Sequence, residues 1–279
     1  MAEVVHTGNT AREQVTQVRI VDGDIRMTVR EDAIAVEEPL EIRIDGQSWS
    51  ITMRTPGDDL DLVAGFLVGE GVITEPEHLA SLAHVANAMY GNTVNAQLGP
   101  GARPPADAAA RHSVTTSACG ICGTESIDAV VKDARWELDS DETRVRSTVL
   151  AELPDRLRAE QSVFDETGGV HAAGLFTAAG DLLCVREDVG RHNAVDKVIG
   201  WAVRQRMLPL RGTVLQVSGR ASFELVQKAR LAGIPMLAAV GAPSTLSRDL
   251  AQTSGLTLVG FSRGTGFTVY THPERVTAD

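Results

Sequence analysis

The chain has 279 residues, of which 43% are hydrophobic and 23% are charged, and its formal net charge is -11 at pH 7. This length and apolar content suffice to bury the core of one large domain or two small ones. The acidic balance excludes a general nucleic-acid binder, and no apolar run approaches the roughly 20 residues of a membrane helix. We therefore expect a cytoplasmic protein with neither a membrane nor a nucleic acid as partner.

The first part of the chain has the pattern of antiparallel strands followed by a helix. Residues 1–11 show no periodicity and are expected to form a loose tail. Alternating apolar residues predict strands at 18–20 and 25–29 around Asp22-Gly23, and at 40–44 and 49–53 around Asp45-Gly46. Acids followed by apolar residues on one face predict a helix from residue 55 to 68.

A short second helix and a hairpin are expected to complete a small α+β unit. The helix is predicted after Thr74, through Leu79 and Leu82. In the hairpin, Gly91-Asn92 separates strands at 85–90 and 94–98. A Gly- and Pro-rich stretch at 99–105 then predicts a mobile loop near a domain seam. We therefore expect an N-terminal α+β domain at 13–110 and a C-terminal α/β domain at 111–279.

The second part of the chain alternates between strands and helices, which is typical of a layered α/β domain. The pattern predicts, in order, a helix at 147–161, a pair of strands at 172–177 and 182–186, a helix at 192–207, a strand at 213–217, a helix at 222–232, a strand at 235–240, a helix at 245–254 and a strand at 256–261.

Two of the three cysteines lie in Cys119-Gly120-Ile121-Cys122-Gly123, and the third is Cys184. An odd number of cysteines suits a reducing compartment better than a disulfide framework. Apolar spacing predicts a helix from residue 125 to 134, which places Cys122 just ahead of a helix N-terminus. The glycines let other groups approach both sulfurs closely.

This cysteine pair is compatible with four interpretations. A structural zinc site needs about four ligands, and no second pair of cysteines or histidines is present. A disulfide-exchange enzyme is weakened by the missing thioredoxin-like βαβ pattern. A persulfide carrier needs a flexible, glycine-flanked thiol that accepts a sulfur and hands it on. In the fourth interpretation both cysteines are ordinary small core residues.

Several glycine-containing loops follow predicted strands and precede helices. They include Val217-Ser218-Gly219-Arg220, Gly241-Ala242-Pro243-Ser244 and Phe261-Ser262-Arg263-Gly264-Thr265-Gly266. Free N–H groups at a helix start, joined by an arginine, are suited to binding phosphate, although glycine and serine are also ordinary turn residues. Because the loops follow neighbouring strands, we expect them to converge on a nucleotide-like ligand.

Two other segments carry polar residues at comparable places. A charged loop at 186–197 contains Asp188, His192 and Asn193 and opens a helix; such residues either bind a polar ligand or simply cap the helix. His171 lies where another loop enters a strand, a common place for a core or turn histidine. The chain has neither the P-loop nor the dinucleotide fingerprint, and it lacks the zinc-deaminase signature.

These motifs, taken together and in this order, resemble those of the FdhD family, the sulfur-carrier accessory proteins required for formate dehydrogenase activity. The segments that carry the resemblance are 118–123, 169–174, 187–197, 217–220 and 261–263. The resemblance implies a cytidine-deaminase-like α/β domain preceded by a smaller α+β domain, and a homodimer.

The resemblance also implies a function. The family receives sulfur from a cysteine desulfurase as a persulfide and passes it to the molybdenum or tungsten bis-pterin guanine dinucleotide cofactor of the formate dehydrogenase catalytic subunit. Cys119 matches the persulfide-forming cysteine, Cys122 its companion, and residues 261–266 the segment assigned to the cofactor. No tightly held metal of the protein's own is implied.

We expect further contacts to the cofactor from loops that can meet its phosphates. The residues expected at this cofactor-binding site are Phe261, Ser262, Arg263, Gly264, Thr265, Gly266, Ser218, Gly219, Arg220, His192 and Asn193. Two other functions stay open, namely a cofactor-binding chaperone that transfers no sulfur and a thiol–disulfide oxidoreductase.

Overall fold

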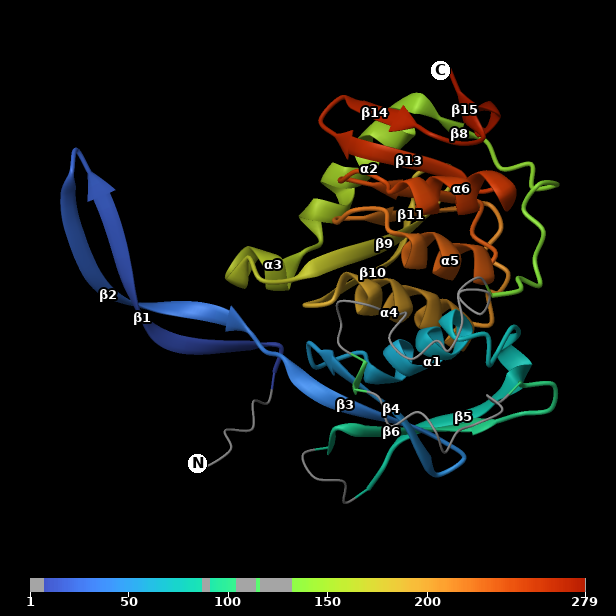
Figure 1. Ribbon diagram of the computed structural model, residues 1–279, viewed down its shortest axis with the longest axis horizontal. Coiled ribbons are helices and arrows are strands. Elements are labelled where there is room, and N and C mark those ends of the chain that lie inside the picture. The colour runs from blue at the N-terminus through green and yellow to red at the C-terminus, as the bar shows by residue number, and fades with distance from the viewer. Residues whose placement is uncertain (1–7, 87–90, 104–113, 116–131, 279) are drawn as a thin grey trace.

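The computed structural model describes residues 8–86, 91–103, 114–115 and 132–278 (Figure 1). Cys119 and Cys122 lie outside the described residues, as does most of the helix expected at 125–134. Residues 132–134, which are described, are not helical. Within the described ranges, no helix is long and apolar enough to cross a membrane.

The first described element is a long antiparallel hairpin that projects from the rest of the molecule (Figure 1). It consists of β1 (Thr10–Val21) and β2 (Asp24–Ala35). Asp22 and Gly23 join the strands with φ angles of 54° and 87°, the left-handed conformation that a two-residue hairpin turn requires. The predicted strand–turn–strand is confirmed. β1 begins at Thr10, so residues 10 and 11, which were expected to belong to a loose tail, are part of the strand.

A five-stranded sheet follows, with strand order β5-β6-β3-β4-β7. Its strands are β3 (Glu38–Ile44), β4 (Gln47–Arg54), β5 (Leu79–His84), β6 (Thr93–Leu98) and β7 (Val114–Thr115). The helix α1 (Asp59–Gly69) packs on this sheet, burying Leu62 and Leu67 in the same cluster as Leu40 and Ile42 of β3. The predictions for β3, β4 and α1 are confirmed.

The helix predicted through Leu79 and Leu82 is wrong. Residues Pro76–His78 form a single 3-10 turn, η1, and the chain then enters strand β5. A break in the strand register between Leu79 and Ser81 puts Leu79 and Leu82 on a common side, which imitates helical spacing. The first strand of the predicted hairpin is displaced as well, because β5 ends at His84 instead of spanning 85–90.

The second part of the chain builds a six-stranded sheet of order β10-β9-β11-β12-β13-β14. Its strands are β9 (His171–Thr177), β10 (Leu182–Asp188), β11 (Thr213–Val217), β12 (Met236–Ala239), β13 (Thr257–Arg263) and β14 (Gly266–Val269). A small parallel pair, β8 (Val145–Arg146) with β15 (Val276–Thr277), and the 3-10 turn η4 (Pro273–Arg275) close the fold.

Helices cover both faces of this sheet (Figure 1). They are α2 (Ser147–Ala159), α3 (Ser162–Thr167), α4 (Arg191–Arg204), α5 (Phe223–Leu231) and α6 (Thr245–Thr253). Residues of β11 alternate between the two faces: Val214 packs into the cluster of α2, whereas Leu215 and Val217 pack into that of α4 and α5. The predicted mixed α/β architecture is confirmed, and the likeness to cytidine deaminases stays a prediction.

The two sheets share a layer of helices in which α1 lies against α4 (Figure 1). A Cβ at Gly65 would lie 1.8 Å from the carbonyl oxygen of Asp196, and one at Gly200 would lie 1.7 Å from that of Asp61. Only glycine permits this approach of the two helices. One buried cluster therefore extends across the expected domain boundary at 110–111, from Leu40 of β3 to Leu258 of β13.

Candidate functional site

The strand-end loops identified in the sequence meet at one edge of the six-stranded sheet. β11, β12 and β13 run parallel, so their carboxyl ends share this edge. β9 runs antiparallel to β11 and β10 antiparallel to β9, which brings His171 and Asp188 to the same edge. The predicted convergence of the loops is confirmed.

Backbone hydrogen bonds hold these loops against one another beyond the strands. The N–H of Gly241 donates to the carbonyl of Gly219 at 2.9 Å, and the N–H of Phe261 donates to the carbonyl of Gly241 at 3.2 Å. A Cβ at Gly241 would lie only 3.0 Å from the Cα of Arg220, so a side chain there would crowd the loop. Arg220 itself is exposed.

A cavity of about 560 Å³ opens between this edge and α2. Ser218 and Arg263, two of the predicted binding residues, line it together with His171. Arg158 of α2 also lines the cavity and adds a second cation. A cavity of this size, with a few charged groups, is typical of sites that hold one small ligand such as a nucleotide.

Arg158 was missed by the sequence analysis. Its position in an ordinary amphipathic helix carried no signal of a binding role, because the sequence does not reveal which helix faces the strand ends. Its guanidinium lies 4.8 Å from the centre of the Phe164 ring and 2.5 Å from a carboxylate oxygen of Asp165. These contacts hold the cation at the wall of the cavity.

Phe261 has a backbone conformation that is rare for a bulky residue, with φ of 52°. The register between β13 and β14 breaks between Gly260 and Arg263, and Phe261 is 41% exposed. The Arg263 guanidinium lies 6.0 Å from the ring centre. An exposed aromatic ring on a strained bulge, next to an arginine, is a platform suited to a planar base.

The rest of the 261–266 segment divides into a buried and an exposed part. The hydroxyl of Ser262 is buried and has no hydrogen-bond partner among the residues that the structure describes. Gly264, Thr265 and Gly266 are exposed and form the turn between β13 and β14. A buried, unpartnered hydroxyl is uncommon in native proteins and fits a site that receives another polar group.

His171 is half-buried and lies next to Gly219. A Cβ added at Gly219 would lie 3.5 Å from the Nδ1 of the His171 imidazole. Burial lowers the pKa of His171 below its ordinary value, and electrostatic interactions with Arg191 and His192 lower it further, against the opposing carboxylate of Asp188. The imidazole is therefore neutral at pH 7 and available as a hydrogen-bond donor or acceptor at the cavity wall.

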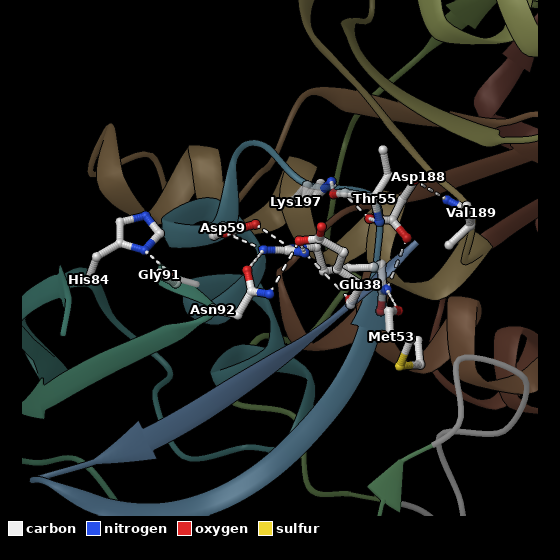
Figure 2. Close-up of polar contacts among 12 residues, drawn as sticks. Glu38, Met53, Thr55, Asp59, His84, Gly91, Asn92, Asp188, Val189 and Lys197 are labelled. Atoms are coloured by element: carbon white, nitrogen blue, oxygen red, sulfur yellow. Dashed lines mark hydrogen bonds and ion pairs between the residues drawn. The ribbon is translucent and has the colours of Figure 1, made fainter. Parts of the chain in front are cut away.

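The segment 187–197, which runs from the end of β10 into α4, joins the two sheets (Figure 2). The fully buried carboxylate of Asp188 accepts hydrogen bonds from the N–H of Thr55 at 3.1 Å and of Gly190 at 2.9 Å, and it lies 2.8 Å from the Lys197 ammonium. Lys197 also donates to the carbonyl of Thr55 at 2.9 Å. This buried pair attaches the end of β4 to the end of β10.

The two predicted binding residues of this segment, His192 and Asn193, lie in the first turn of α4 and are buried. The Asn193 amide donates to the carbonyl of Met53 at 2.8 Å and to Asp188 at 3.0 Å, so it serves the same attachment. The His192 Nε2 lies 2.5 Å from a carboxylate oxygen of Glu224 at the start of α5. Neither side chain lines the cavity, and their role in binding stays a prediction.

The described residues that flank the cysteine segment are held in place on both sides. β7, which ends at Thr115, pairs in parallel with β4, with Thr115 opposite Thr52. On the other side, the Lys132 ammonium lies 3.0 Å from a carboxylate oxygen of Glu70. The backbone N–H of Lys132 donates a hydrogen bond to the side-chain oxygen of Gln227 at 3.1 Å. The described residues on both sides of the cysteine segment, Thr115 and Lys132, are therefore anchored to the rest of the fold.

Cys184, the cysteine that the structure describes, is buried. Burial raises the pKa of its thiol to about 12, so the thiol is protonated and unreactive at neutral pH. Among the described residues, no cluster of histidine, cysteine or acidic side chains could hold a metal ion.

The chain is similar in sequence to proteins named "Sulfur carrier protein FdhD". It is 54% identical to the one from Streptomyces coelicolor over 273 residues, covering 96% of this chain and 95% of the relative. It is 48% identical to the one from Mycobacterium tuberculosis, covering 94% and 97%, and 43% identical to the one from Sulfolobus acidocaldarius, covering 88% and 92%.

The fold is similar to a crystal structure described as a candidate formate dehydrogenase accessory protein from Desulfotalea psychrophila. The TM-score is 0.76 at 24% sequence identity, covering 95% of this chain and 99% of that chain. The model of the FdhD/NarQ family matches residues 35–277, which include the cysteine segment and every loop at the sheet edge. The chain therefore belongs to the FdhD/NarQ family.

Proposed function

We propose that the protein is a sulfur carrier that activates formate dehydrogenase. It takes sulfur from a cysteine desulfurase on Cys119 and transfers it to the molybdenum or tungsten bis-pterin guanine dinucleotide cofactor of the catalytic subunit. The observation that carries the proposal is that the family's motifs within the described residues meet at one sheet edge, around a cavity with two arginines. The anchored ends of the cysteine segment support it.

In this proposal the cavity holds a guanine nucleotide end of the cofactor. Arg263 and Ser218, which line the cavity, meet phosphate oxygens, and Gly219 and Arg220 next to Ser218 extend this contact. Phe261 does not line the cavity; its ring lies beside Arg263 and stacks on a base that reaches past the cavity. These local donors offset the net charge of -11 of the whole chain. The volume of about 560 Å³ suits one nucleotide end, so the metal end of the cofactor extends beyond the cavity.

The sulfur moves in two thiol-exchange steps. The Cys119 thiolate attacks the outer sulfur of the desulfurase persulfide, and the desulfurase leaves as a thiolate, so that Cys119 carries the persulfide. The Cys122 thiolate then attacks the Cys119 Sγ and forms a disulfide, and the terminal sulfur leaves as sulfide to the metal acceptor. A cellular dithiol reduces the disulfide and restores both thiols.

Mass spectrometry after incubation with a cysteine desulfurase and cysteine tests the carrier step. We expect one added sulfur on the wild-type chain and none on Cys119→Ala. Cys184→Ala is the matched control and keeps the adduct, because burial holds that thiol protonated. A chain that binds guanine nucleotide but never gains sulfur would favour the chaperone, and turnover of dithiol substrates without an adduct would favour the oxidoreductase.

Calorimetric titration with GDP tests the cavity. We expect Arg263→Ala to weaken GDP binding about tenfold or more, since a charge-assisted hydrogen bond is lost. Arg248→Ala is the matched control: Arg248 is exposed on α6, pairs with its neighbour Asp249 and does not line the cavity. Equal affinities of the two variants would place the nucleotide elsewhere.

A further inference from the structure

Arg191, the first residue of α4, has no partner for its charge among the residues that the structure describes. No hydrogen bond or ion pair joins its guanidinium to them, and its Nε is buried without a hydrogen-bond partner. The residue is half-buried, and withdrawing a charge from water is costly unless the charge is paired. The unpaired guanidinium therefore points to an anion that binds there.

The position of Arg191 in its helix makes this charge more unfavourable. The N-terminus of a helix carries a partial positive charge, which favours acidic side chains and disfavours basic ones in the first turn. α4 has no acidic residue in its first turn, and no side chain caps its N-terminus. An arginine at this position does not stabilise the helix, so a structural role does not account for it.

The carboxylates near the start of α4 already have other partners. Asp188 lies 2.8 Å from the Lys197 ammonium and accepts the N–H of Gly190 at 2.9 Å (Figure 2). Glu224 lies 2.5 Å from the His192 Nε2. Neither carboxylate forms an ion pair with Arg191, so its counter-charge has to come from outside these residues.

The other arginines at this edge of the sheet are less dependent on an added anion. Arg158 has the carboxylate of Asp165 at 2.5 Å. Arg220 and Arg263 are exposed, so water hydrates their charges. Arg191 alone among these four is both half-buried and without a counter-charge within the described part of the chain.

The Arg191 side chain lies next to the wall of the cavity. A Cβ added at Gly219 would lie 3.7 Å from the Cδ of Arg191 and 3.5 Å from the Nδ1 of His171. His171 and Ser218 line the cavity. Gly219 has no side chain that would separate Arg191 from this wall, so an anion bound at His171 is within reach of the arginine.

His171 suits the same anion. Burial and the interaction with Arg191 hold its pKa below the ordinary value, so the imidazole is neutral at pH 7. A neutral imidazole can donate one hydrogen bond to a phosphate oxygen, while the guanidinium of Arg191 donates two in parallel. Together they offer one charge and several donors to a single phosphate group.

We propose that Arg191 and His171 bind a second phosphate of the ligand, next to the phosphate that Ser218 and Arg263 meet. The site thereby selects a nucleoside diphosphate, or the pyrophosphate of a dinucleotide, over a monophosphate. This inference rests on the proposed function, because it places the nucleotide in the same cavity.

Calorimetric titration of the full chain with GDP and with GMP tests the proposal. We expect the wild type to bind GDP about tenfold or more tightly than GMP. Arg191→Gln weakens GDP binding about tenfold or more and changes GMP binding less than about twofold, because only GDP carries the second phosphate. Arg191→Lys restores part of the GDP affinity, since it keeps the charge but loses the parallel pair of donors.

Thermal unfolding separates this binding role from a structural one. We expect Arg191→Gln to unfold at the temperature of the wild type or above it, because an unpaired charge leaves the helix N-terminus. Arg204→Gln, at the other end of α4, is the matched control. Arg204 pairs with the buried Asp61, so this variant unfolds at a lower temperature and keeps both nucleotide affinities.

The two nucleotides also separate the failure of this proposal from that of the proposed function. A wild type that binds neither GDP nor GMP refutes the nucleotide cavity and the second phosphate site together. A wild type that binds both with equal affinity, or an Arg191→Gln variant that weakens both equally or neither, refutes the second phosphate site alone. An Arg191→Gln variant that unfolds at a lower temperature and keeps its GDP affinity shows that Arg191 is structural.

Discussion

At the scale of single residues, Phe261 combines an unfavourable backbone with an exposed ring. A left-handed φ costs a residue with a Cβ about 1–2 kcal/mol, and an exposed side chain recovers little of this by burial. Such strain persists where the surrounding structure imposes it, and it is concentrated at functional sites. The hydrogen bond from the Phe261 N–H to Gly241 is one of the contacts that impose it here.

Replacing Phe261 by glycine or alanine separates strain from binding. Phe261→Gly relieves the strain, whereas Phe261→Ala keeps it. We therefore expect the glycine variant to be the more stable of the two, with a free energy of unfolding about 1 kcal/mol larger than that of the alanine variant. Both variants lose the ring and bind GDP about tenfold more weakly. Urea denaturation and calorimetry measure the two effects. An alanine variant as stable as the glycine variant would contradict the strain argument.

At the scale of elements, the ends of β4, β10 and α4 are joined by the buried pair of Asp188 and Lys197. Asp188 has three further donors, the N–H groups of Thr55 and Gly190 and the Asn193 amide. Among the residues that the structure describes, the Lys197 ammonium contacts, besides the Asp188 carboxylate, only the carbonyl oxygens of Thr55 and Glu187. The two charges are therefore unequally protected against the loss of their partner, and the lysine depends more on the aspartate.

We expect the loss of Asp188 to lower the free energy of unfolding more than the loss of Lys197 does. Asp188→Asn leaves a buried ammonium without a counter-charge and lowers stability by about 3–5 kcal/mol. Lys197→Met costs less, because the carboxylate keeps its three N–H donors. The exposed pair of Glu152 and Arg156 gives the control, and Glu152→Gln changes stability by about 0.5 kcal/mol or less. Urea denaturation compares the variants; a Lys197→Met cost equal to that of Asp188→Asn would refute the argument.

The sequence predicted strands and helices where periodicity and turn residues agree. The hairpin at Asp22-Gly23 and the strand Thr213–Val217 are examples, because short-range sterics and alternation determine them. It failed at Leu79 and Leu82, where a break in register makes a strand look helical. α3 was missed because Ser162–Thr167 is too short for a periodic signal.

The candidate site was predicted only where it depends on the order and direction of the strands, and not where it depends on how the helices pack. Glycine-containing loops after parallel strands indicate a shared edge, so the convergence of Ser218 and Arg263 on one cavity followed from topology alone. Arg158 did not follow, because its place in the cavity depends on how α2 packs across the sheet. Asn193 was expected at a ligand but is bonded to β4, since polar residues that bind a ligand and those that join elements have the same composition.

At the scale of the whole molecule, the two sheets are mechanically one body. The buried cluster runs from Trp49 of β4 through α1 and α4 to the six-stranded sheet. Charged contacts cross the same boundary, including the pair of Arg186 with the buried Asp61 at 2.8 Å. The helix α1, which covers the five-stranded sheet, packs in turn on α4 of the six-stranded sheet, so the two regions predicted as separate domains share one buried cluster.

We therefore expect both sheets to unfold in a single transition. The fluorescence of Trp49 reports on the five-stranded sheet, where the centres of the Trp49 and Phe66 rings lie 5.4 Å apart. The fluorescence of Trp201 reports on α4. Replacing two of the three tryptophans by phenylalanine leaves one reporter at a time. The urea midpoints of the Trp49 and Trp201 signals should coincide, as they do in two-state unfolding. A Trp49 signal that changes at a clearly lower urea concentration would show that the N-terminal sheet unfolds independently.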